Sequence, residues 1–161
     1  MSYILSSQRD LDCNAAFIRY EKYLKDHQTD CPESAYKYAT SDWWYDFENH
    51  RCPHDAWLED LQIIERSSGD RHQVRWTDIS IRLLGAYHDG IIELTYKNVK
   101  RYDIQCDQDS RGDWRYDQFT GLGTSFRHEI EWDDGVIWSI EAEELIYTWQ
   151  ENKTNQANKA Q

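Results

Sequence analysis

Two Asp-Gly dipeptides, each set between runs of alternating apolar and polar residues, constrain the fold of this chain most strongly. Asp-Gly in that setting is a strong signal for a tight β-hairpin, because the favoured two-residue turns need positive φ angles. The flanking runs cover residues 74–83 and 92–96 around Asp89-Gly90, and residues 129–132 and 136–140 around Asp134-Gly135. The sequence therefore predicts at least two antiparallel hairpins.

The alternation in the second hairpin predicts one apolar face and one acidic face, since successive strand residues point to opposite sides. The face expected to point into the core comprises Trp132, Val136, Trp138 and Ile140. The face expected to meet water comprises Glu129, Glu131 and Glu141.

Helical spacing dominates the first fifty residues. One apolar stripe consists of Cys13, Phe17, Tyr20 and Leu24. A second stripe, which follows start signals at Asp30, Pro32 and Glu33, predicts a helix that ends near Asn49. Two helices followed by strands indicate an α+β fold, with two N-terminal helices packed on an antiparallel sheet of about five to seven strands.

The length of 161 residues corresponds to about one domain. We expect residues 1–150 to form a single α+β domain. Residues 151–161 are polar and lack periodicity, which predicts a disordered tail.

Composition restricts the classes of function. Eight Trp and eleven Tyr are too many for a disordered acidic segment. A net charge of −12 opposes binding to nucleic acids and to anionic membranes. The N-terminal residues show no secretory pattern, and no stretch has the ~20 apolar residues of a membrane span. We therefore expect a cytoplasmic protein with reduced cysteines, and no cofactor is indicated.

The best candidate for metal or hydrolytic chemistry is the segment 50–55. His50, Cys52 and His54 alternate there, Asp55 follows, and Cys31 lies upstream. Zinc accepts thiolate and imidazole ligands, but this spacing matches no standard pattern. No Gly-x-Ser-x-Gly motif or phosphate-binding loop is present, so the chain is not expected to be an enzyme. A small metal-binding protein or hydrolase using this segment stays open as the alternative function.

The acidic residues from 129 to 144 are the best candidate for a binding surface. This stretch has seven acids and no Lys or Arg, whereas ordinary surfaces intersperse both signs. A field of one sign attracts a partner of the opposite sign and raises its association rate. The predicted partner-binding residues are Glu129, Glu131, Asp133, Asp134, Glu141, Glu143 and Glu144.

Two segments carry a resemblance to a known class of proteins. They are His54-Asp55-Ala56-Trp57-Leu58 and Leu83-Leu84-Gly85-Ala86-Tyr87-His88-Asp89. Residues 54–96, together with the acidic, aromatic-rich α+β character, resemble the immunity proteins of bacterial toxin systems, including contact-dependent inhibition. This resemblance implies binding and neutralisation of one cognate toxin, often a basic nuclease, and assigns no role to individual residues.

Overall fold

The structure, a computed structural model, describes residues 2–106 and 112–152, and within them it forms four helical segments and eight strands. The helices are α1 (Ser6–Arg9), α2 (Cys13–Asp26), the short 3₁₀ helix η1 (Gln28–Asp30) and α3 (Glu33–Ala39). The strands are β1 (Trp57–Ser68), β2 (Val74–Leu84), β3 (Gly90–Lys97), β4 (Arg101–Asp103), β5 (Trp114–Gly121), β6 (Phe126–Trp132), β7 (Ile137–Ala142) and β8 (Glu144–Glu151). The predicted α+β class is confirmed, with more strands than expected. Of the predicted tail, Glu151 still belongs to β8, and residues 153–161 lie outside the described residues.

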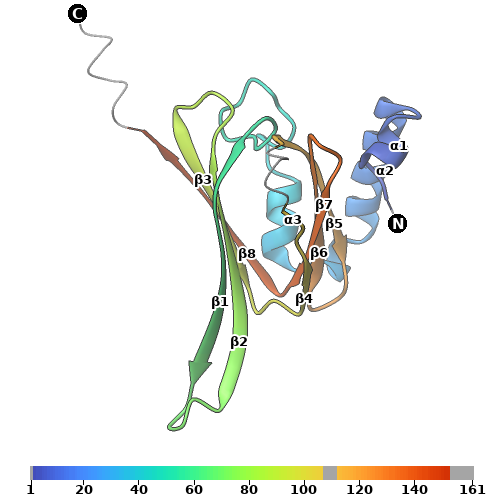
Figure 1. Cartoon of the computed structure of the whole chain (residues 1–161). Coiled ribbons are helices and arrows are strands. Elements are labelled where there is room, and N and C mark those ends of the chain that lie inside the picture. Colours follow the sequence, from blue (N-terminus) through green and yellow to red (C-terminus); the bar gives the residue numbers. More distant parts are fainter. Residues whose placement is uncertain (1, 107–111, 153–161) are drawn as a thin grey trace, which may run out of the picture.

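The strands form two antiparallel sheets rather than one. Sheet A has the order β1-β2-β3-β8, and sheet B has the order β4-β7-β6-β5. Figure 1 shows α3 between the two sheets, α1 and α2 beside β5, and the long β1–β2 hairpin projecting away from the body. The sequence predicted helices packed on a single sheet. The structure differs, because α3 lies between two sheets (Figure 1).

Aromatic side chains connect α3 to both sheets. The ring of Tyr38 lies 5.1 Å from Phe119 of sheet B and 5.7 Å from Tyr147 of sheet A. Trp43, just after α3, stacks on Tyr147 at 4.4 Å. These contacts fill the space between the sheets with large rings, which accounts for the high aromatic content of the chain.

The helix that begins at Glu33 ends at Ala39, ten residues before the predicted end near Asn49. The hydroxyl of Thr40 donates to the carbonyl of Tyr36 at 2.7 Å, and the Ser41 hydroxyl donates to Lys37 at 2.6 Å. These bonds satisfy carbonyls that a continuing helix would use. The predicted helix end near Asn49 was wrong. The apolar residues after Ala39 belong to a loop, in which Trp43 packs on Tyr147.

Both Asp-Gly dipeptides lie at antiparallel hairpin connections, as predicted. Asp134-Gly135 closes a short turn, in which Gly135 has φ +85° and its N–H donates to the Trp132 carbonyl at 2.9 Å. Asp89-Gly90 instead ends the longer loop 85–89. Gly90 is required there because a Cβ would lie 2.2 Å from the indole of Trp149.

The outer edge of β5 is closed by tyrosine hydroxyls instead of a further strand. Tyr20 accepts a hydrogen bond from the N–H of Phe119 at 2.5 Å and donates to its carbonyl at 3.2 Å. Tyr45 accepts from the N–H of Asp117 at 2.5 Å, and Tyr23 accepts from that of Gly121 at 3.0 Å. The helices and the loop after α3 are thereby fixed against sheet B.

A chain of buried hydrogen bonds then joins sheet B to sheet A. Nε2 of His128 lies 2.7 Å from a carboxylate oxygen of Asp117, and its Nδ1 lies 2.7 Å from the hydroxyl of Tyr96 on β3. The other Asp117 oxygen accepts from Tyr45 and from the indole of Trp114. Each of these polar atoms has a hydrogen-bond partner in the interior. The network therefore stabilises the fold and fixes the two sheets relative to each other.

We expect Tyr20→Phe to lower the free energy of unfolding by about 1–3 kcal/mol, because it removes the partner of two buried main-chain groups of Phe119. Tyr38→Phe is the matched control, since its equally buried hydroxyl has no hydrogen-bond partner among the described residues. The free energy of unfolding of this variant should not fall, because the change removes a buried hydroxyl that makes no hydrogen bond. Urea titration measures both, and equal losses would contradict the role of Tyr20 at the edge.

Candidate functional site

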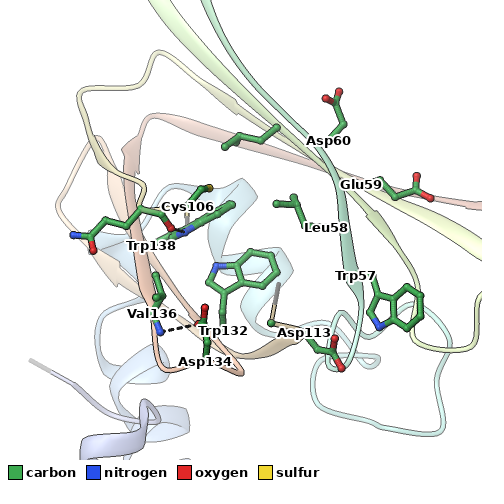
Figure 2. A pocket seen from close by; sticks show the side chains of 13 residues that line it. Trp57, Leu58, Glu59, Asp60, Cys106, Asp113, Trp132, Asp134, Val136 and Trp138 are labelled. Carbon is green, nitrogen blue, oxygen red and sulfur yellow. Dashed lines mark hydrogen bonds between the residues drawn. The ribbon is translucent and has the colours of Figure 1, made fainter. Parts of the chain in front are cut away.

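A groove of about 770 Å³ opens where the start of β1 faces the β6–β7 turn (Figure 2). Its walls therefore come from both sheets. We call it the tryptophan groove, and its described lining residues are Trp57, Leu58, Glu59, Asp60, Leu61, Gln105, Cys106, Gly112, Asp113, Trp132, Asp134, Val136 and Trp138.

Local features of the chain position these walls. A register shift between Leu58 and Asp60 marks a β-bulge, which changes the direction of side chains at the start of β1. Opposite it, the N–H of Asp133 donates to the carbonyl of Asp113 at 2.8 Å. Gly112 allows this approach, because a Cβ there would lie 3.0 Å from main-chain nitrogens of the β6–β7 turn.

Two tryptophans give the groove much of its apolar surface. Trp132 and Trp138 lie on either side of the turn with ring centroids 4.7 Å apart. The indole of Trp138 donates to the carbonyl of Gln105 at 2.8 Å. The indole N–H of Trp132, which is 95% buried, has no hydrogen-bond partner among the described residues. Trp57, at the start of β1, directs its ring away from Trp132 and Trp138 (Figure 2) and contacts His88 with ring centroids 4.3 Å apart.

The polar part of the groove is acidic. It is lined by Glu59, Asp60, Asp113 and Asp134, and none of its described lining residues is Lys or Arg. The guanidinium of Arg82, outside the lining, pairs with Glu59 at 3.2 Å. Burial, and then the nearby charges of Asp133 and Asp55, raise the pKa of the Asp113 carboxyl. The groove thus holds negative charge that a cationic ligand would stabilise.

The predicted acidic residues do not form one surface. Glu131 is only 3% exposed and pairs with Arg9 at 2.7 Å, so the prediction that it faces water was wrong. Its neighbour Glu129, partly buried, accepts a hydrogen bond from Gln118 at 3.1 Å. This face of sheet B is covered by the N-terminal segment, whose Ser6 N–H also donates to Glu131 at 2.7 Å.

The remaining predicted acids divide between two regions. Glu141 pairs with Arg127 at 2.8 Å and Glu143 with Lys100 at 2.6 Å, so both have basic neighbours. Glu144 is exposed at the start of β8. Asp133 and Asp134 are exposed in the β6–β7 turn, and Asp134 lines the tryptophan groove.

The alternative segment 50–55 is engaged in structural contacts. His50 pairs with Asp89 at 2.5 Å, and Nδ1 of His54 lies 2.5 Å from the Arg115 carbonyl. Burial raises the pKa of the Cys52 thiol to about 11, which disfavours the thiolate that a metal needs. Among the described residues, no three His, Cys, Asp or Glu side chains converge to hold a metal ion.

Sequence reasoning missed the β1 wall of the groove. Asp60 and Asp113 lie far apart in the chain and come together only because the two sheets pack against each other. The signal that could have located the wall is the apolar pair Trp57-Leu58 at the start of a strand, followed directly by Glu59-Asp60. That juxtaposition breaks the period of two, as a bulge does.

Comparison of the chain with protein-family models, with curated proteins and with solved structures gives no significant match. Within the described residues, no helix combines the length and apolar character that a membrane crossing requires.

We expect Asp113→Asn to stabilise the protein at pH 7. Because the folded state raises the pKa of this carboxyl, wild-type stability falls as pH rises from the ordinary Asp pKa through the raised value. The gain of the variant in free energy of unfolding should therefore shrink toward zero by about pH 3, where the carboxyl is protonated in both states. Denaturant titration at several pH values measures it. Asp103→Asn, exposed on β4, controls for removal of one negative charge, and an equal gain there would refute a local cause.

Proposed function

We propose that this chain is a cytoplasmic protein-binding domain that neutralises a basic partner through the tryptophan groove, as immunity proteins of bacterial toxin systems do. The observation that carries the proposal is the composition of the groove. Four acidic residues and the indoles of Trp132 and Trp138 line it (Figure 2), without a Lys or Arg among its described lining residues.

This combination suits Arg or Lys side chains of a partner. A guanidinium or ammonium group is attracted to the face of an indole, most strongly when water is excluded. Carboxylates add charge-assisted hydrogen bonds, which are shorter and stronger than neutral ones. Glu59 already has Arg82 as a partner, so Asp60, Asp113 and Asp134 are the carboxylates that a cationic partner would engage.

A protein fits the groove better than a small cation. A small cation would leave the indoles of Trp132 and Trp138 uncovered. A polypeptide supplies apolar side chains beside its basic ones. It therefore meets the indoles and the carboxylates together.

The net charge of −12 adds long-range attraction to this local recognition. Such attraction acts before contact and raises the association rate, whereas packing on the tryptophans governs dissociation. A neutralising protein benefits from both properties, because it must capture its target quickly and hold it.

The test uses the product of the gene adjacent to the one encoding this chain. Expressed alone it should arrest growth, and co-expression of this chain should restore growth. The triple reversal Asp60→Lys, Asp113→Lys and Asp134→Lys should abolish protection and slow association by about tenfold or more, measured by surface plasmon resonance.

A matched triple variant controls for total charge. Glu21→Lys, Asp42→Lys and Glu48→Lys change the net charge equally, and all three residues are exposed and outside the groove. This variant should retain protection. Equal loss of protection in both variants, with circular dichroism showing both folded, would contradict a role for the groove.

A further inference from the structure

We propose that the partner enters as an extended basic strand that pairs with the open edge of β1, adds a fifth strand to sheet A and places its basic side chains against the tryptophan groove. This inference rests on the proposed function and specifies how the partner binds. Main-chain pairing would supply affinity, and the groove would select the side chains.

The pairing of sheet A identifies the main-chain groups that face the open edge. The N–H of Val99, just after β3, donates to the carbonyl of Thr77 on β2 at 2.8 Å. The main-chain groups of Thr77 therefore face β3. Because successive strand residues direct these groups to opposite edges, those of Asp78 and Ser80 face β1.

The same alternation applies to β1 itself. Ile64 and Gln62 are the register partners of Asp78 and Ser80, so their N–H and C=O groups bond to β2. The groups of Leu61, Ile63 and Glu65 then point outward. Within residues 2–106 and 112–152, strand pairing of β1 is with β2 alone, and no other main-chain bond reaches this edge.

The two outermost strands of sheet B differ from β1. Tyrosine hydroxyls occupy the edge of β5, and β4 has only three residues. At the other edge of sheet A, the N–H of Leu145 on β8 donates to the Ser34 hydroxyl at 2.9 Å. β1 has twelve residues and carries neither Pro nor Lys, and its register shift between Leu58 and Asp60 lies before the outward-facing residues 61–65.

The side chains of β1 also leave an apolar face uncovered. Leu61 and Ile63 are opposite Ile81 and Ile79, which are fully buried on the core face of sheet A. Ile63 is nevertheless 43% exposed, and Figure 1 shows the β1–β2 hairpin projecting away from sheet B. An added strand would shield this surface and continue into the acidic groove at the start of β1.

Charge favours a basic strand over a second copy of this chain. Two copies would each carry a net charge of −12, so their association is opposed by repulsion. A strand with alternating basic side chains instead meets Asp60, Asp113 and Asp134 as it passes the groove.

The test uses a blocked nine-residue peptide of alternating Arg and Val, and a twin in which alternate main-chain nitrogens are methylated. The twin keeps the charge but cannot form a ladder, so it should bind at least about tenfold more weakly by isothermal titration calorimetry. On binding of the unmethylated peptide, the amides of Leu61, Ile63 and Glu65 should gain protection from hydrogen exchange. The amides of Gln62 and Ile64 should be protected already.

A pair of protein variants tests the same edge. Ile63→Pro removes an outward N–H and is compatible with an edge strand, whereas Ile63→Thr keeps the N–H. The Pro variant should bind the peptide at least about tenfold more weakly and the Thr variant within about threefold of wild type, both with wild-type circular dichroism.

The possible outcomes separate the two proposals. Equal binding of both peptides, or no binding of either, overturns strand addition but leaves growth protection by the wild-type chain to decide the proposed function. A dimer of the chain alone that Ile63→Pro dissociates would assign the edge to a second copy and overturn the inference. Strand addition by the peptide without growth protection would overturn the proposed function instead.

Discussion

The outer edge of β5 carries main-chain N–H groups that the helical layer covers, and such groups are costly to bury without partners. Tyr20, Tyr23 and Tyr45 supply the partners from two segments of the chain, α2 and the loop after α3. A long side chain ending in one hydroxyl can both accept from an N–H and donate to a neighbouring oxygen, as Tyr20 does at Phe119. The edge therefore determines where α2 and the loop after α3 must lie.

The same strand fixes the distance between the two sheets. Asp117, whose N–H is bound by Tyr45, directs its carboxylate inward to His128, and His128 reaches Tyr96 on sheet A. Burial raises the pKa of the Tyr96 phenol, which keeps it in the neutral form that can donate. These hydrogen bonds hold sheet B to sheet A through β5, β6 and β3. Elsewhere between the sheets, the start of β1 faces the β6–β7 turn (Figure 2). The groove occupies that space.

The sequence was most informative where the controlling interaction is local. Period-two alternation located β2, β3, β6 and β7, and both Asp-Gly dipeptides marked true hairpin connections. It failed where distant segments decide the outcome. Glu131 alternates as a surface residue should, but Arg9 and the Ser6 N–H, more than 120 positions away, convert that site into a buried ion pair. Similarly, position 90 favours glycine because the indole of Trp149 lies against it, and no local sequence pattern reveals this contact.

A run of like charges along a chain is thus a poor guide to a charged surface in a sheet protein. Glu129 and Glu131, two positions apart on β6, share one face, and the N-terminal segment that carries Arg9 covers it. Of the predicted acids, Asp133 and Asp134 in the connection and Glu144 at the first position of β8 are exposed. In the groove, the acidic neighbours of Asp134 are Asp60, brought near by the packing of the two sheets, and Asp113, whose carbonyl accepts from the Asp133 N–H. The negative field of the groove is therefore a property of the fold. Variants that remove the tyrosine hydrogen bonds to the β5 edge should therefore weaken this negative field, although they change no charge.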